Sequence, residues 1–155
     1  MHQQFMQAAI ALAEEKVPLG EGGPFAAVIV LDGRIIGHGW NRVVASNDPT
    51  AHAEVVAIRN ACRNTGNFRL TGATLYVTCE PCPMCLAATY WAGISALYYA
   101  TTREDAAAIG FADAHIYKEI ALPLPERSLP MRQLMRDAAL PVMARWECMP
   151  EKIRY

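Results

Sequence analysis

The sequence predicts a layered α/β domain, because short apolar runs of strand length alternate along it with segments of helical periodicity. The chain has 155 residues, which is typical of one domain with a single sizeable core. Hydrophobic residues make up 53% of it and charged residues 19%, as in a globular protein slightly shifted toward burial. In so small a chain, part of this apolar surface is expected to lie in an interface between subunits.

The first half of the chain predicts a helix, a hairpin and a second helix. Positions 3–17 place apolar side chains on one helical face until a proline interrupts the pattern. The runs 25–31 and 34–40, joined by Asp32-Gly33, predict a β-hairpin. A polar loop then supplies helix-start residues, and a helix is expected from about 51 to 63.

The second half continues the alternation of strands and helices. Positions 73–79 alternate as a strand does, and Pro81-Cys82-Pro83 then opens a helix. Residues 96–100 form a further apolar strand. Short helices are expected at 103–108 and 113–120.

A Pro-rich connector occupies residues 121–130, where three prolines favour an extended and stiff chain. One interpretation is a surface loop on the same subunit. The other is an arm that carries residues 131–155 onto a neighbouring protomer. Composition alone leaves both open.

Charge and hydropathy weigh against nucleic acid and membranes as partners. The formal net charge is −1, so the basic footprint typical of nucleic-acid-binding proteins is missing. No apolar run approaches the roughly 20 residues that a membrane span needs. The N-terminus lacks the features of a signal peptide, and we therefore expect a cytoplasmic protein. Closely spaced cysteines in that reducing compartment indicate metal or redox chemistry.

One histidine and two cysteines give the strongest chemical signal. Cys82 and Cys85 lie three residues apart at the start of a helix, so one turn points both sulfur atoms toward the same spot. The helix N-terminus favours the thiolate form, which binds zinc. His52, from a different helix, completes three ligands and leaves a fourth tetrahedral position open, as catalytic zinc sites require. A water bound there loses a proton near neutral pH.

Glu54 lies two residues after His52 and is not needed as a ligand. A carboxylate beside such a water can take its proton and deliver it to a ring nitrogen and to departing ammonia. The combination suits hydrolysis of a C–NH2 group on a heterocycle.

The cysteine pair alone would equally fit a redox pair or half of a structural zinc site. A structural site normally has four protein ligands, and the other cysteines are poorly placed and expected only to pack: Cys62, Cys79 and Cys148. The combination H-x-E with P-C-x-x-C is the signature of zinc nucleobase deaminases. Three lone histidines are expected to be ordinary surface or core residues: His2, His38 and His115.

Two blocks, DPTAHAE at 48–54 and CEPCPMC at 79–85, resemble the cytidine deaminase superfamily. Within it, nearly the whole chain resembles the small bacterial guanine deaminases, and the stretches 110–113 and 116–119 narrow the likeness. The resemblance implies a three-layer α/β/α sandwich around a mixed five-stranded sheet. It also implies one zinc ion per subunit and a homodimer that exchanges residues 131–155.

The resemblance further implies five substrate-binding residues. Asn41 would hydrogen-bond the purine, Phe25 would stack on or wall the ring, and Trp91 would border the pocket. Asp113 would bind the edge near the amino group being removed, and Tyr155 would reach into the partner's site. Alternatives remain open: a turn for Asn41, core packing for both aromatic residues, a helix cap for Asp113 and a loose chain end for Tyr155.

The implied reaction is guanine to xanthine and ammonia, a step of purine catabolism, by attack at C2 while Glu54 protonates the neighbouring ring nitrogen. A tRNA adenosine deaminase shares both motif blocks and is one alternative. Guanosine, cytosine or an aminotriazine as substrate is another. Ala112 stands where the resembling proteins tend to have an acid, which bears on the preferred heterocycle. A non-catalytic zinc protein is a third alternative, but it would have no use for Glu54.

Overall fold

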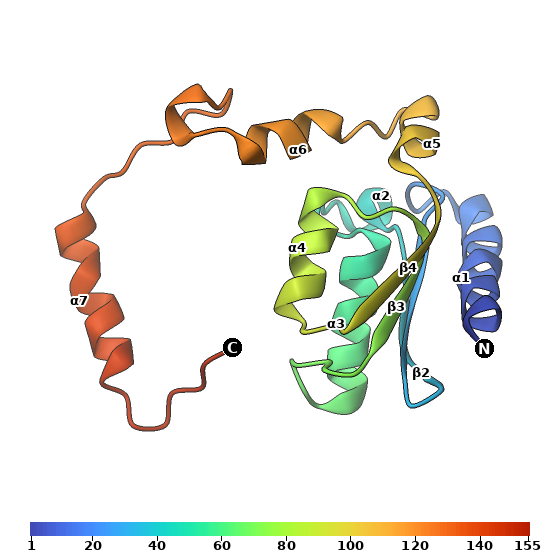
Figure 1. Cartoon of the computed structure of the whole chain (residues 1–155), viewed down its shortest axis with the longest axis horizontal. Helices are drawn as coiled ribbons and strands as arrows, with labels where there is room; N and C mark the ends of the chain where they lie inside the picture. The colour runs from blue at the N-terminus through green and yellow to red at the C-terminus, as the bar shows by residue number, and fades with distance from the viewer. The chain divides into compact units, whose positions relative to one another are not determined.

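A mixed four-stranded sheet organises the first part of the chain (Figure 1). The computed structural model describes residues 1–155, which divide into two units, Met1–Ala114 and His115–Tyr155. The strands are β1 Ala26–Leu31, β2 Arg34–Trp40, β3 Thr74–Cys79 and β4 Ala96–Thr101. In the sheet they follow the order β2-β1-β3-β4. Strand β1 is antiparallel to both of its neighbours, whereas β3 and β4 are parallel.

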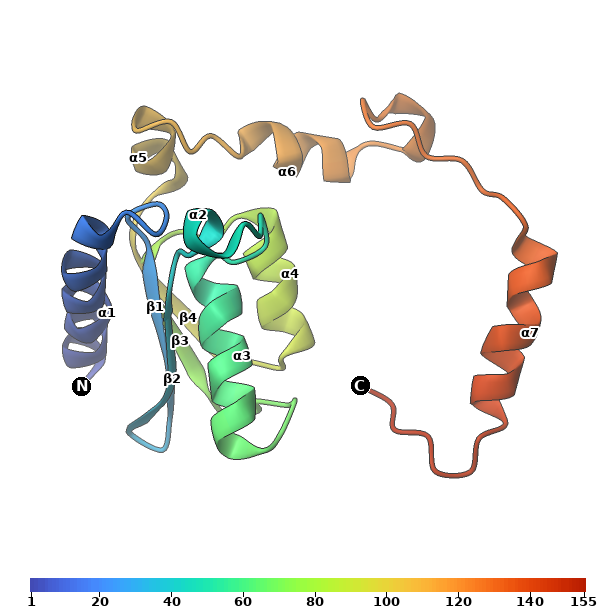
Figure 2. The same cartoon turned by 180° about the vertical axis from the view of Figure 1, so that it is seen from behind.

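Helices cover both faces of the sheet, which confirms the predicted three-layer arrangement (Figures 1 and 2). Helix α1 (His2–Lys16) packs against β1 and β3 from one side. Helix α3 (Ala53–Thr65) packs against β1 and β2 from the other side, with α4 (Pro83–Trp91) beside it.

Alternate residues of β1 build one core on each face of the sheet. Ala27 and Ile29 belong to the core under α3, whereas Val28 and Val30 belong to the core under α1. Successive side chains of a strand point to opposite faces. A strand covered on both faces is therefore apolar at every position, and this is why residues 25–31 form an unbroken apolar run.

The resemblance implied five strands, and this number was wrong, because the sheet has four. After β4 the chain enters α5 (Arg103–Ala108), since Thr102 and Asp105 form a capping box that starts a helix. The connector's prolines lack the N–H groups that a strand donates to its neighbour. The later elements are α6 (Ala114–Ala121), the 3-10 turn η2 (Leu124–Glu126) and α7 (Arg136–Glu147).

The helices predicted from periodicity are present, with ends within two residues of those expected. Two short elements were not predicted, the 3-10 turn η1 (Val17–Leu19) and helix α2 (Val43–Ser46). Helix α2 is a single turn that ends at Asn47, whose φ of 48° is left-handed. One turn is too short for periodicity to reveal.

The second unit, His115–Tyr155, contains no buried residue. Its helix α7 was not assigned from the sequence, and Pro141 lies inside it, where proline disfavours a helix. Large apolar side chains of this unit are exposed, among them Ile120, Leu129, Leu134, Met143 and Ile153. The exchange of residues 131–155 between protomers stays a prediction. None of the chain's helices combines the length and apolar character that crossing a membrane requires.

Candidate active site

Three side chains converge where α3 and α4 begin. His52 is the N-cap residue of α3, Cys82 is the N-cap residue of α4, and Cys85 lies in the first turn of α4. The Nδ1 atom of His52 is 3.6 Å from Cys82 Sγ and 3.5 Å from Cys85 Sγ. All three ligand atoms lie within 4.8 Å of one another, which confirms the predicted cluster.

These distances fit a tetrahedral zinc ion. A Zn–S bond of about 2.3 Å and a Zn–N bond of about 2.1 Å, meeting at the tetrahedral angle, separate nitrogen from sulfur by about 3.6 Å. The two observed nitrogen–sulfur distances, 3.5 and 3.6 Å, agree with this value. No fourth His, Cys, Asp or Glu joins the group. The protein therefore leaves one tetrahedral position for solvent or substrate, as in catalytic sites.

Without a metal, the pKa values of the two cysteines are shifted in opposite directions. Hydrogen bonds from the Cys85 thiol, from His52 and from the Cys85 backbone N–H lower the pKa of Cys82. The bond to Cys82, together with burial, raises the pKa of Cys85. The neighbouring Cys82 sulfur also raises the pKa of His52. A divalent cation held by these three residues would supply the positive charge that lets both sulfurs become thiolates.

Glu54 is a buried carboxyl group beside this cluster. It is the second residue of α3, and only 7% of its surface is exposed. Burial is the main cause that raises the pKa of its carboxyl, and the charge on Cys82 adds to the effect, whereas a hydrogen bond from Cys85 opposes it. A carboxyl with a raised pKa beside a metal site is suited to carry protons in both directions.

Asn41 is buried directly after β2, and its side chain has a defined orientation. Its backbone N–H donates to the Phe25 carbonyl at 2.9 Å, and its Oδ1 accepts from the Val43 N–H at 3.1 Å. Because Oδ1 is bound to the Val43 N–H, the orientation of the side-chain amide is defined, and its Nδ2 amino group can donate to another partner. The turn-forming role and the substrate-binding role are thus compatible.

An aromatic pair and a carboxylate lie nearby. The ring of Phe25 meets Phe111 edge-on, with 5.0 Å between the centroids. A Cβ atom on Gly23 would lie 2.8 Å from Phe111 and 2.9 Å from Phe25, so glycine allows this close approach. Asp113 is near enough to Cys82 for their charges to interact, and burial raises the pKa of Asp113.

Two predicted site residues do not lie beside the metal ligands within the first unit. Trp91 is in the first unit but far along α4, and Tyr155 is in the second unit. Trp91 is the last residue of α4 and 70% exposed. It follows Cys85 by six residues, a rise of about 9 Å along the helix. Tyr155 ends the second unit and is 76% exposed. The roles of both residues stay predictions.

The sequence did not reveal two contacts of this region. Phe111 lies in the stretch 110–113 that carries the resemblance, but the sequence did not predict its contact with Phe25. Glu21 hydrogen-bonds both neighbours of Asn41, which follow it by 19 and 21 residues. No local pattern signals a contact over such separations.

The remaining cysteines lie outside the metal group, as expected. Cys62 and Cys79 point their sulfur atoms at backbone carbonyls, and Cys148 is exposed. Of the lone histidines, His2 hydrogen-bonds Tyr76 through Nδ1 at 2.7 Å. The other two, His38 and His115, are exposed.

Residues 1–101 match the family described as the cytidine and deoxycytidylate deaminase zinc-binding region. The matched range contains the three metal ligands and Glu54. It ends where β4 ends, so it covers the whole sheet.

Individual relatives extend the likeness over the full chain. Guanine deaminase from Bacillus subtilis (strain 168) is 50% identical over 154 residues, which are 99% of each protein. An X-ray structure of guanine deaminase from Bacillus subtilis superposes with a TM-score of 0.94 at 50% identity and covers 100% of this chain and 99% of that one. The tRNA-specific adenosine deaminase of Haemophilus influenzae is 45% identical over 109 residues, 70% of this chain and 62% of that protein. The likeness to the tRNA enzyme is thus confined to part of each chain.

Proposed function

The chain belongs to the cytidine and deoxycytidylate deaminase zinc-binding family, and from this membership we propose that it hydrolyses guanine to xanthine and ammonia. The observation that carries the proposal is the 50% identity to a guanine deaminase over 99% of both chains. The site supports it, because three metal ligands stand beside a buried carboxyl group. A purely structural zinc site has no use for that carboxyl.

The residues that would hold zinc are His52, Cys82 and Cys85, with one ion per chain. Bound to three protein ligands, zinc supplies hydrolytic chemistry by lowering the pKa of a water at its fourth position. Cys82 is the N-cap residue of α4, and the backbone N–H of Cys85 in the first turn helps to lower the pKa of its thiol.

Glu54 moves the protons of the reaction. Its carboxylate takes a proton from the attacking water and delivers it to the ring nitrogen next to C2 of guanine. The same group then takes the remaining proton from the water oxygen, which is now a hydroxyl on C2, and delivers it to the amino group. The C2–N bond breaks, ammonia leaves and the carbonyl of xanthine forms. Its burial keeps bulk water away from these transfers and strengthens the electrostatic interactions around it.

Several residues are assigned to hold the base. The Nδ2 group of Asn41 donates a hydrogen bond to an acceptor atom of the purine. Phe25 forms an aromatic wall for the ring and is itself supported by Phe111. Asp113 accepts from the amino edge of guanine near C2. The resemblance implies an acid at position 112, where this chain has alanine, so Asp113 is the carboxylate at this edge.

The proposal includes a homodimer that exchanges residues 131–155. Support comes from the second unit, which exposes many large apolar side chains and buries none. Such a segment gains little stability unless another surface covers it. In this arrangement Tyr155 reaches the partner's site, and Trp91, with 70% of its surface exposed, borders the pocket. A cytoplasmic location fits the five free cysteines.

The experiment that tests the function is an ammonia-release screen of the zinc-loaded protein. Its substrates are guanine, guanosine, adenine, cytosine and aminotriazines. We expect release from guanine to exceed release from every other compound by at least about a hundredfold. Faster ammonia release from guanosine, cytosine or an aminotriazine would still indicate a hydrolytic deaminase, but it would show that guanine is not the preferred substrate.

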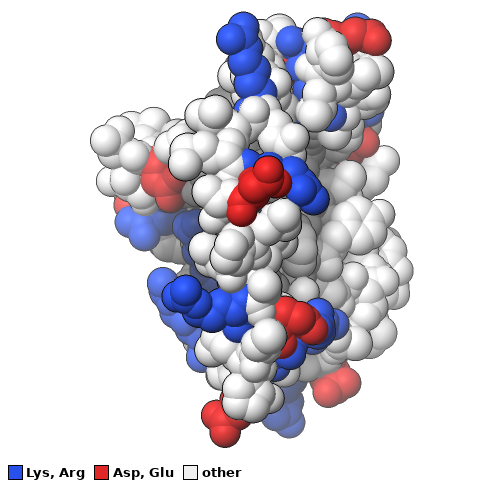
Figure 3. Space-filling view, turned by 90° about the vertical axis from the view of Figure 1, so that its left-hand side faces the viewer, with Lys and Arg blue, Asp and Glu red and all other residues white.

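A tRNA anticodon stem-loop belongs in the same screen, because part of the chain is 45% identical to a tRNA-specific adenosine deaminase. RNA binding needs a basic surface that tracks phosphates. The formal net charge of the chain is −1, and on the face drawn in Figure 3 Lys and Arg are interspersed with Asp and Glu and with uncharged surface. We expect no turnover of the stem-loop.

A further inference from the structure

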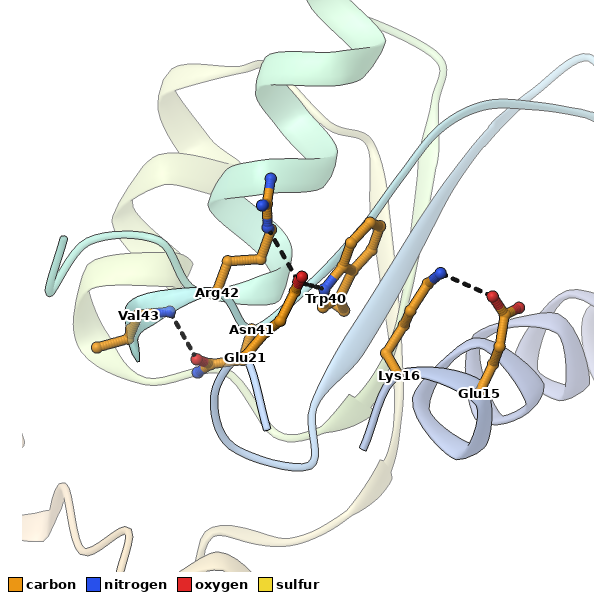
Figure 4. A network of polar contacts seen from close by, with 7 residues as sticks. All are labelled: Glu15, Lys16, Glu21, Trp40, Asn41, Arg42 and Val43. Carbon is orange, nitrogen blue, oxygen red and sulfur yellow. Dashed lines mark hydrogen bonds and ion pairs between the residues drawn. The ribbon is translucent and has the colours of Figure 1, made fainter. Parts of the chain in front are cut away.

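One carboxylate connects the two residues on either side of Asn41 (Figure 4). Glu21 lies in the loop between η1 and β1, and its Oε2 accepts a hydrogen bond from Trp40 Nε1 at 2.6 Å. The same oxygen accepts from Arg42 Nε at 3.2 Å. Trp40 and Arg42 flank Asn41, so a single carboxylate holds the side chains on both sides of that residue. This is in addition to the backbone bonds from Asn41 N–H to Phe25 and from Arg42 N–H to Ala51.

The pair around Asn41 is held further by cations. Lys16 Nζ lies over the Trp40 ring at 4.7 Å from its centroid, and the Arg42 guanidinium lies at 5.4 Å from the same centroid. A cation over an indole face is attracted to it. Hydrogen bonds to an ionised acceptor are also about twice as strong as neutral ones. The indole therefore has a fixed place beside Asn41.

Glu21 also holds this segment through its backbone. Its carbonyl oxygen accepts from the N–H groups of Val44 at 3.1 Å and Ala45 at 3.0 Å. These two bonds do not depend on the side chain. A substitution at Glu21 thus leaves the loop attached and removes only the contacts to the neighbours of Asn41.

We propose that Glu21 is a positioning residue, which aims the Asn41 amide at the base through Trp40 and Arg42. This role rests on the proposed function, in which Asn41 donates to the purine. The Asn41 oxygen is bound to Val43 N–H, so the amino group points in one direction only while the backbone at 40–42 is fixed. Without the carboxylate the Trp40 and Arg42 side chains lose their common anchor, while the backbone bonds of Asn41 and Arg42 to Phe25 and Ala51 remain. The donor beside these side chains is then less well preorganised for the base.

The test measures steady-state kinetics of Glu21→Ala in the native background and in an Asn41→Ala background. Glu21→Ala is expected to raise KM for guanine about tenfold while kcat changes less than about threefold. In the Asn41→Ala background the same change is expected to alter KM by less than about twofold, because the group being aimed is gone. Glu21→Gln, which keeps an acceptor, is expected to restore part of the affinity.

Matched controls separate aiming from a general loss of structure. Glu15→Ala removes a neighbouring carboxylate that touches the network only through Lys16, at 2.7 Å, and is expected to leave KM unchanged. Zinc content and melting temperature of Glu21→Ala are expected to stay close to those of the native chain. Equal effects of Glu21→Ala in both backgrounds would overturn the proposal.

A second measurement does not depend on guanine turnover. In the zinc-loaded protein, the Asn41 side-chain amide gives a pair of nitrogen–proton NMR signals, assigned by their loss in Asn41→Ala. We expect these signals to shift or broaden in Glu21→Ala and to stay in place in Glu15→Ala. If the native protein fails to deaminate guanine, the proposed function is wrong. Asn41 signals that stay unchanged in Glu21→Ala would independently show that Glu21 does not position Asn41.

Discussion

Gly39 of β2 lies so close to Ala53 of α3 that a Cβ atom on the glycine would stand 2.5 Å from the Ala53 carbonyl oxygen. Ala53 lies between His52, a metal ligand, and Glu54, the proposed proton carrier. The distance between this strand and this helix therefore decides where both groups stand. The contact between Gly39 and Ala53 thus affects both the packing of α3 on the sheet and the position of the reactive groups.

Gly39→Ala is predicted to lower the free energy of unfolding by about 1–3 kcal/mol, because backbone rather than a flexible side chain blocks the added methyl group. The new atom would also lie 2.5 Å from the Ala57 backbone nitrogen. The start of α3 must shift, and we expect kcat for guanine to fall at least about tenfold. Urea unfolding and steady-state kinetics measure the two effects.

Gly66→Ala is the matched control for that change. Gly66 has a φ of 65°, so alanine is strained there, but no atom lies within 4 Å of the added Cβ. We expect a loss of about 1 kcal/mol in stability without a loss of turnover. Equal activity of the two variants would show that the contact at Gly39 does not position the site.

Glu54→Gln is predicted to reduce kcat by at least about a hundredfold while one zinc ion stays bound, because an amide cannot shuttle protons. The side chain is not a metal ligand and is buried, and glutamine has nearly the same shape. Zinc analysis and an ammonia assay on the same sample measure both quantities. Glu104→Gln, at an exposed position of α5, serves as the control. Native turnover in the Glu54→Gln variant would remove the proposed mechanism.

Removal of zinc with a chelator is predicted to abolish turnover and to lower the melting temperature, because a ligand that binds only the folded state stabilises it. Activity should return in proportion to zinc added, up to one ion per chain. Cys82→Ser is expected to bind zinc more weakly, since a hydroxyl replaces a thiolate ligand. Cys148→Ser changes an exposed sulfur outside the group and should bind zinc normally. Full activity in the chelated protein would contradict a role for the metal.

Strand β1 and the metal group were predictable from the sequence for physical reasons. The same reasons do not apply to the contacts of Glu21 or to the number of strands. The unbroken apolar run at 25–31 is what a strand buried on both faces requires. The central place of β1 in the fold therefore follows from the composition of this run. Cys82 and Cys85 converge because helix geometry fixes their spacing. The hydrogen bond between Glu21 and Trp40 forms only in the folded loop, and no periodic pattern in the sequence predicts it. The fifth strand was expected from resemblance alone, and the residues after Thr101 form helices instead.

The proposed exchange of residues 131–155 between protomers predicts complementation between two impaired variants. Tyr155→Ala lacks the proposed contact to the partner's site, and Glu54→Gln lacks the proton carrier; each is expected to lose at least about tenfold in kcat/KM. In a mixed dimer, the protomer with native Glu54 receives the native Tyr155 of the Glu54→Gln protomer, so one complete site forms. Unfolding and refolding an equal mixture should therefore restore activity to about a quarter of the native level, since random pairing makes half of the dimers mixed. Each variant refolded alone is the control. If Tyr155 serves its own chain, the mixture gains nothing over the separate samples, because no chain in it carries both groups.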